Sequence, residues 1–191
     1  MRDAGVGRVL LASLHQGIAD ILPTRLGFYE SWLHAKGLRD GTIDLAPLYA
    51  VLSFLRQEGD PAYAKITTSA GEYAAEWTVQ SMGAFERWML RTAPHWLRKR
   101  LVLRLSNRLA HASYRRCRLS FRLRRNTATL DLRRSLFCDV RDPVGHALCG
   151  FYTAAFLRLF ALFNVAARID VTSCRATGGA TCAMTATIES A

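Results

Sequence analysis

The chain has 191 residues, 50% of them hydrophobic, and a net charge of +11. This composition excludes an intrinsically disordered chain, and the length fits one domain with a sizeable core. The longest apolar stretch, 151–163, is too short to span a bilayer and contains Arg158. Polar residues interrupt the first apolar run, which argues against a secretory signal. We therefore expect a soluble, cytoplasmic protein whose five cysteines are reduced thiols or metal ligands.

The first 113 residues are predicted to be mainly helical. Apolar residues recur at three- and four-residue intervals, and proline and glycine mark the boundaries. Asp60-Pro61 is a typical helix start, and Gly37 and Gly59 are typical helix ends. The expected helices cover 6–22, 23–36, 45–58, 60–83 and 94–113, with a short segment over 84–93.

Beyond residue 115 the period of the apolar pattern changes to two. Apolar side chains and arginines alternate over 116–124, which predicts a strand with one buried and one basic face, and 128–132 predicts a second strand. An apolar helix is expected over 149–164, followed by a hairpin over 168–175 and 181–189. The pattern predicts an α+β fold, in which a helical N-terminal half precedes an antiparallel sheet of about four strands with one long helix between two hairpins.

No internal repeat, low-complexity tract or flexible linker divides the chain. We therefore expect one domain over 1–191. Within it, residues 1–68 form a helical N-terminal extension that offers a candidate dimer surface.

Three cysteines in the last quarter of the chain are candidate metal ligands. Cys149 opens the apolar helix, and Cys174 and Cys182 flank a turn at Gly178-Gly179. Across a hairpin centred on Gly178, the side-chain carbons of Cys174 and Cys182 would lie ~5 Å apart, close enough to share one metal. Zinc takes four ligands, and the further candidates nearby are Cys138, His146 and Asp170. The alternative is that these thiols are small buried side chains of a reduced protein.

Aromatic residues concentrate in the helical half and in the helix expected over 149–164. Flat rings can sandwich a planar or lipophilic ligand, whereas an aromatic residue at helical spacing also fits an ordinary core. The residues that we expect to line a ligand pocket are Tyr73, Trp77, Phe156 and Phe160.

The positive charge is concentrated in one segment. Residues 96–134 carry 13 lysines and arginines and a single acid, Asp131. Arg100, Arg104 and Arg108 flank a leucine stripe, which favours contact with an anionic membrane surface or an acidic partner enzyme. The same pattern also describes an amphipathic helix packed on a sheet. We do not expect nucleic acid as a partner, because no DNA- or RNA-binding motif accompanies the charge.

The C-terminal part of the chain resembles a known family. The run LCGFYTAAFLRLFALFNVAARIDVTSCRATGGATCAMTATI has a cysteine before a helix, Cys-x-Ala-x-Gly after a strand, and a further cysteine before an alternating strand. This order is similar to that of the 4-vinyl-reductase-like domain family. The branch named for bacteriochlorophyll biosynthesis looks most similar, since FCDVRDPVGHALCGFYTAAFLRLF and APHWLRKRLVLRLSNRLAHASY have counterparts there. The resemblance covers 69–189.

The resemblance implies a fold shared with small subunits of vesicle-tethering complexes and with haem-based nitric-oxide sensors. Members of the family bind a small or lipophilic molecule between helices and sheet, and often dimerise. In its aromatic-sensing regulators three cysteines and a glutamate bind zinc, and the matching cysteines here are Cys149, Cys174 and Cys182. Val171 stands at the glutamate position. Its neighbour Asp170 is expected to share the strand face of Cys174.

The expected function is therefore to bind a lipophilic or planar small molecule. By resemblance, the protein would be a homodimeric tetrapyrrole carrier or accessory factor in bacteriochlorophyll biosynthesis, cytoplasmic and peripheral at the membrane, with zinc as its only cofactor. We do not expect catalysis, because the sequence has no dinucleotide loop, phosphate loop, nucleophile elbow or metalloprotease motif. The alternatives are a vinyl-group reductase acting on a chlorophyll precursor and a dimeric sensor or scaffold subunit.

Overall fold

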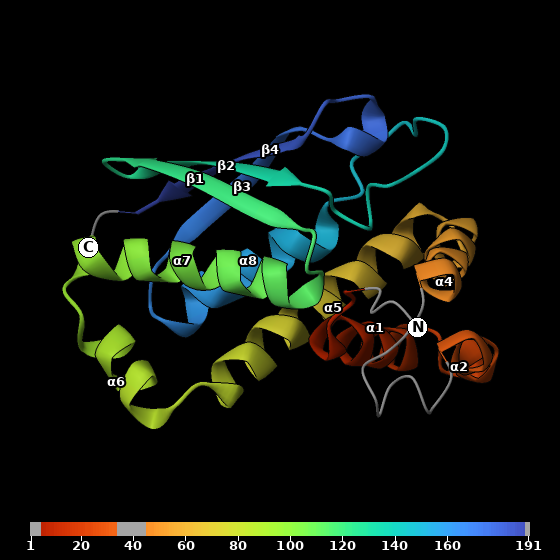
Figure 1. Ribbon diagram of the computed structural model, residues 1–191, viewed down its shortest axis with the longest axis horizontal. Coiled ribbons are helices and arrows are strands. Elements are labelled where there is room, and N and C mark those ends of the chain that lie inside the picture. Colours follow the sequence, from red (N-terminus) through yellow and green to blue (C-terminus); the bar gives the residue numbers. More distant parts are fainter. Residues whose placement is uncertain (1–4, 34–44, 190–191) are drawn as a thin grey trace.

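Helices occupy the N-terminal part of the described structure, and the sheet strands begin only at residue 118 (Figure 1). The computed structural model describes residues 5–33 and 45–189. The elements in chain order are α1 (Arg8–Ile21), η1 (Pro23–Arg25), α2 (Leu26–Leu33), α4 (Leu45–Gln57), α5 (Asp60–Ser81), α6 (Ala84–Thr92), α7 (His95–Ser113), β1 (Arg118–Arg124), β2 (Thr127–Arg133), α8 (Gly150–Leu162), β3 (Ala167–Ser173), η2 (Arg175–Thr177) and β4 (Cys182–Ile188). The predicted α+β class is confirmed. The end predicted for the second helix, at Gly37, lies outside the described residues.

Proline and glycine set the helix boundaries. α1 ends at Ile21, and Pro23 begins the 3₁₀ turn η1, so the single helix expected over 23–36 starts instead as η1 followed by α2. Gly59 precedes α5 with a φ of +98°, a conformation that residues with a Cβ rarely adopt. Asp60 and Pro61 then form the first turn of α5.

The sheet is antiparallel throughout, with the strand order β1-β2-β4-β3. Arg125, at a φ of 52°, lies in the tight turn between β1 and β2. Leu119, Leu130 and Met184 are buried on one face of the sheet. Alternate residues of β1, namely Ser120, Arg122 and Arg124, are exposed. One face of the sheet therefore packs on the helices, as the alternating pattern predicts.

α8 is the central helix of the molecule, covered by the sheet on one side and by α5 on the other (Figure 1). Small residues allow the two helices to approach closely. A Cβ added to Gly71 of α5 would lie 2.3 Å from the backbone oxygen of Phe151 and 3.0 Å from the backbone nitrogen of Ala155. Because it is covered on both sides, α8 is apolar around most of its circumference.

One hydrophobic cluster joins the N-terminal helices to the sheet. Leu14 of α1, Leu52 of α4 and Leu159 of α8 all belong to it and are essentially inaccessible to solvent. Residue 68, the predicted end of the N-terminal extension, lies inside α5. None of the described helices is long and apolar enough to cross a membrane.

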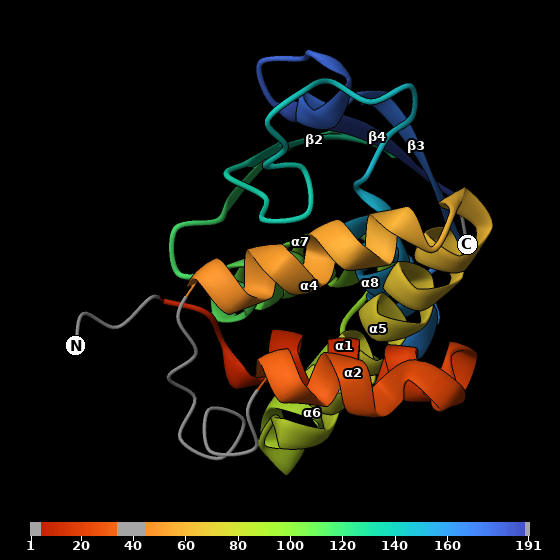
Figure 2. The ribbon, with the colours of Figure 1, turned by 90° about the vertical axis from the view of Figure 1, so that its right-hand side faces the viewer.

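Two connections meet at one end of the sheet (Figures 1 and 2). One is the segment 134–149 between β2 and α8, and the other is the β3–β4 connection, which contains η2. The backbone N–H of Val144 donates to the carbonyl oxygen of Ala176 at 2.8 Å, which ties the two connections together. The candidate metal-ligating cysteines gather at this end.

Candidate metal centre

Four buried cysteines come together where the two connections meet. Cys138 lies in the segment after β2, Cys149 immediately precedes α8, Cys174 follows β3, and Cys182 is the first residue of β4. The side-chain sulfurs all lie within 4.8 Å of one another. Four thiols from four separate chain positions therefore surround one point.

The spacing of the sulfurs is close to what a single metal ion would require. The Sγ of Cys149 lies 3.4 Å from that of Cys138 and 3.2 Å from that of Cys174. Cys174 in turn lies 3.6 Å from Cys138 and 3.9 Å from Cys182. In a tetrahedral zinc centre with Zn–S bonds of about 2.3 Å, neighbouring sulfurs are about 3.8 Å apart. A disulfide would need about 2.05 Å, and all of these cysteines are free.

The glycine pair after η2 allows the chain to return to the cluster. Gly178 adopts a φ of +91°, in the left-handed region. A Cβ added to Gly179 would lie 2.5 Å from Ser173 Oγ and 2.8 Å from the Cys174 carbonyl oxygen. The N–H of Gly179 donates to that same oxygen at 3.0 Å. This tight turn places Cys182 beside Cys174.

Hydrogen bonds among the sulfurs divide the thiols into two kinds. Hydrogen bonds with Cys138, Cys149 and Cys182 hold the pKa of Cys174 well below its usual range. The pKa of Cys182 is also lowered, by Cys138 and Cys149 and by the N–H of Arg175, whose nitrogen is 3.5 Å from the sulfur. By contrast, the pKa of Cys149 is raised by its hydrogen bonds with neighbouring sulfurs and by its burial. A divalent cation could replace the shared protons and neutralise the buried negative charge.

The other predicted ligands lie away from this cluster. His146 is exposed, and its Nδ1 faces Asp60 at 3.5 Å. Asp170 is also exposed and pairs with Arg168. The expectation that Asp170 and Cys174 share a strand face was wrong, because an irregularity between Val171 and Ser173 shifts the register of β3 before Cys174. The structure instead brings in Cys138, which the sequence offered only as one of several further candidates.

The predicted ligand-binding aromatics lie in two different environments. Phe156 and Phe160 are buried in the core, and Tyr73 stacks on Trp77 with ring centroids 5.5 Å apart. The hydroxyl of Tyr73 donates to Asp20 at 2.8 Å. None of these four residues lines any of four hollows in the described part of the chain.

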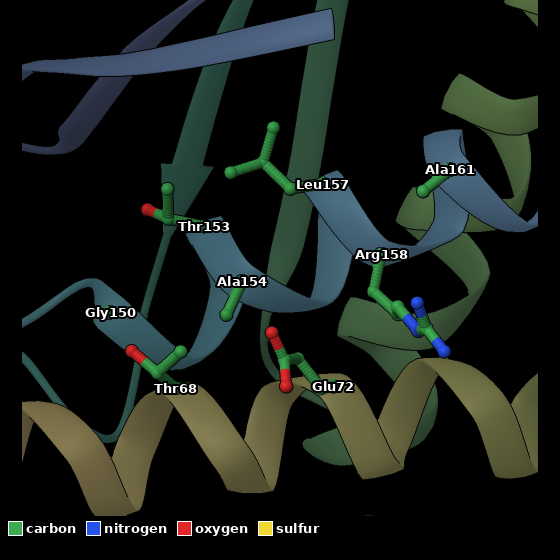
Figure 3. Close-up of a pocket in the computed structure, with 8 residues that line it drawn as sticks. All are labelled: Thr68, Glu72, Gly150, Thr153, Ala154, Leu157, Arg158 and Ala161. Atoms are coloured by element: carbon green, nitrogen blue, oxygen red, sulfur yellow. The ribbon is translucent and has the colours of Figure 1, made fainter. Parts of the chain in front are cut away.

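A groove of about 370 Å³ lies between α5 and α8 instead (Figure 3). Thr68 and Glu72 contribute from α5, and small or apolar side chains such as Ala154 and Leu157 contribute from α8. Arg158, at one end, pairs with Glu76 at 2.5 Å. Sequence periodicity could not reveal this groove, because it arises from the small residues that let two helices approach.

The predicted basic residues of α7 differ in their surroundings. Arg100 and Arg104 are exposed, and neither has an ion pair with another described residue. Arg108 pairs with Glu86 of α6.

The sequence matches no family model and no curated protein. Solved structures of H-NOX proteins share the fold, at 11% sequence identity. One from S. oneidensis in the Fe(II)NO ligation state has a TM-score of 0.52 and is covered completely, with 97% of this chain aligned. An unliganded Fe(II) mutant from K. algicida has a TM-score of 0.59 with 97% of each chain aligned. The NMR structure of an H-NOX domain from Shewanella oneidensis in the Fe(II)CO ligation state has a TM-score of 0.53, with 97% of this chain and 99% of that chain aligned. The predicted similarity to the fold of haem-based nitric-oxide sensors is thus confirmed.

Proposed function

We propose that this protein is a non-catalytic small-molecule-binding module of the 4-vinyl-reductase-like type, in which a zinc ion held by four cysteines fixes one end of the sheet. The arrangement of the four sulfurs carries the proposal. Cys138, Cys149, Cys174 and Cys182 would fill all four positions of a tetrahedral zinc. A closed site leaves no position for a substrate or an activated water, so the ion would have a structural role.

A zinc ion at this position would join parts of the chain that local structure alone does not hold together. Cys138 lies in a segment without regular secondary structure, and Cys174 follows an edge strand. Since the unfolded chain lacks a preformed site, the free energy of metal binding would contribute to folding. The predicted single domain over 1–191 fits this proposal, because the described N-terminal helices share one hydrophobic cluster with the sheet.

The groove between α5 and α8 is the candidate site for a lipophilic ligand. Its volume of about 370 Å³ is within the range of small-molecule sites. Ala154, Leu157 and Ala161 offer an apolar wall, and Glu72 and Arg158 offer polar contacts at its edge. Phe156 and Phe160 could touch a ligand only if the core opened. The spacing of the cysteines supports a module of the 4-vinyl-reductase-like type, and through it a tetrapyrrole or similar planar ligand.

The described residues do not offer the axial ligand that a haem iron would need. A sensor haem needs an axial ligand, most often a histidine, within a closed pocket. None of the histidines in the described part of the chain is buried: His15 contacts Glu30, and His111 contacts Arg118. The thiols of the cluster face one another. We therefore propose a different small ligand from that of the H-NOX proteins.

Zinc analysis tests the central proposal. Protein purified without chelator should contain one zinc per chain, and Co²⁺ exchanged into it should give the absorption of tetrahedral thiolate ligation. The Cys138→Ala variant should lose the metal. The Cys117→Ala variant removes a buried cysteine outside the cluster and should keep it. Purified protein with no metal and four thiols that react freely would contradict the proposal. Native mass spectrometry of the same sample would report bound ligand and oligomeric state.

We also propose that the protein associates with an anionic membrane surface through α6 and the start of α7. Phe85, Trp88 and Trp96 are 73%, 60% and 62% exposed, a high exposure for large apolar side chains. Trp96, Arg100 and Arg104 recur every fourth residue and thus lie along one side of α7. Exposed tryptophans beside arginines are typical of surfaces that rest in the headgroup region of anionic bilayers.

A further inference from the structure

A second hollow lies beside the cysteine cluster and has a different chemistry. It has a volume of about 370 Å³, and its lining includes Tyr114, Arg116, Arg134, Ser135, Asp139 and Arg175. Three of these residues are arginines and one is an acid.

The acid in this hollow is already neutralised. Asp139 accepts a hydrogen bond from the hydroxyl of Tyr49 at 2.6 Å and pairs with Arg175 at 2.8 Å. Burial, followed by this bond to Asp139, raises the pKa of Tyr49, so the hydroxyl stays protonated and donates. Arg175 and Asp139 therefore contribute no net charge to the hollow.

The other two arginines have no such partner. In the described part of the chain, neither Arg116 nor Arg134 has a hydrogen bond or an ion pair. Both side chains are exposed and line the same hollow. Two guanidinium groups thus remain available to an anion, and guanidinium groups bind the oxygens of phosphates and carboxylates with two parallel hydrogen bonds.

A buried hydroxyl in the same lining is also unsatisfied. Ser135 is 2% exposed, and its Oγ has no hydrogen-bond partner. Buried hydroxyl groups are normally paired, and an unpaired one in a binding hollow suggests a missing ligand atom. Arg134, at a φ of +59°, directly follows β2 and breaks the strand alternation, which lets the consecutive residues 134 and 135 line one hollow.

We propose that this hollow binds the oxyanion group of a small molecule, a phosphate or a carboxylate. Arg116 and Arg134 would pair with the anion, and the hydroxyl of Ser135 would donate to one of its oxygens. The site does not depend on the proposed zinc. Cys138 nevertheless lies between Ser135 and Asp139, and Cys174 precedes Arg175, so an ion in the cluster would hold the hollow in shape.

Calorimetric titration of the intact chain tests this site. Inorganic phosphate and succinate are titrated separately at equal ionic strength in chloride buffer, and we expect saturable binding of at least one of them. The tighter of the two identifies the preferred group. The double variant Arg116→Ala/Arg134→Ala should bind about ten-fold or more weakly, and Arg122→Ala/Arg124→Ala, which removes the same charge elsewhere on the sheet, should bind normally.

The Ser135→Ala variant separates binding from folding. Because its hydroxyl has no partner in the free protein, its removal should leave the melting temperature unchanged or higher while anion binding weakens several-fold. If both double variants bind the anion equally weakly, the binding reflects only the overall positive charge of the protein. That result would overturn the proposed site. The absence of saturable binding with either anion would overturn it as well. The zinc content of the same samples is also measured. It shows whether a loss of anion binding comes from the anion site itself or from a loss of metal.

Discussion

Cys149 and Cys174 stand 25 positions apart in the chain, yet their sulfur atoms lie 3.2 Å apart. Cys149 immediately precedes α8 and Cys174 immediately follows β3, and both lie at the same end of the sheet. The distance is too long for a disulfide and shorter than the roughly 3.8 Å between sulfurs on one zinc. We therefore expect this pair to move slightly apart when metal binds.

Removing the fourth cysteine should destabilise the protein more than removing the isolated one. Cys138→Ala is expected to lower the free energy of unfolding by about 4 kcal/mol, because it removes a metal ligand as well as a buried side chain. Cys117→Ala should cost about 1 kcal/mol, the price of a small cavity. Denaturant unfolding in the presence of zinc measures both. Equal losses in the two variants would contradict a structural metal.

The close approach of α5 and α8 predicts opposite effects for two glycine substitutions. Gly71→Ala should lower the free energy of unfolding by about 2–3 kcal/mol, because its Cβ would meet the backbone oxygen of Phe151 at 2.3 Å. Gly27→Ala, in α2, meets no atom within 4 Å and should raise it by about 0.5–1 kcal/mol. Thermal melting distinguishes the two, and a stable Gly71→Ala protein would mean that the helices can separate at little cost.

The pH dependence of stability has an identifiable contributor in Glu58. Burial alone would raise its pKa, but the hydrogen bonds from Tyr29 and Arg25 outweigh burial and lower it from the ordinary value of 4.5. A lowered carboxyl pKa stabilises the fold above about pH 4.5, and the contribution is lost as the pH falls through the folded-state pKa. Glu58→Gln should therefore cost about 1 kcal/mol at pH 7 and nothing at pH 2. Urea unfolding at the two pH values, with Glu72→Gln as the control, measures the difference.

The exposed surface of α6 and α7 predicts binding to anionic vesicles. Trp88→Ala should weaken sedimentation with vesicles rich in phosphatidylserine by about ten-fold. Arg100→Ala/Arg104→Ala should weaken it by about thirty-fold and reduce its salt dependence, at about 1 kcal/mol for each base. Trp32→Ala, on α2, is the matched control. A dimer that buries Trp88 in solution would instead assign this surface to a second copy of the chain.

The sequence predicted the elements well because their signals are local. Pro23 and Gly59 end helices for reasons that lie in their own backbones, and the alternation over 116–124 needs only a period of two. The gathering of Cys149, Cys174 and Cys182 was also predictable in outline. Their order along the chain places them at the ends of neighbouring elements.

Long-range packing explains what the sequence did not reveal. The irregularity in β3 that separates Asp170 from Cys174 depends on how β3 pairs with β4, which no local pattern records. Phe156 lies in the core because α8 is covered on both sides. Trp88 is exposed because α6 is covered on one side only, at Leu90. Aromatic content alone does not distinguish these environments. The anion hollow likewise combines residues from segments far apart in the chain.

The central position of α8 has a consequence for the synthesis of the protein on the ribosome. Every helix from α1 to α7 leaves the exit tunnel before α8 does, yet α5 packs its small-residue face against α8. Until residue 162 has emerged, α8 cannot cover that face, and β2 lacks its neighbour β4 until residues 182–188 have emerged. A nascent chain that stops at residue 145 should therefore expose an apolar helix face to chaperones, and we expect its release from them only after α8 and β4 have been synthesised.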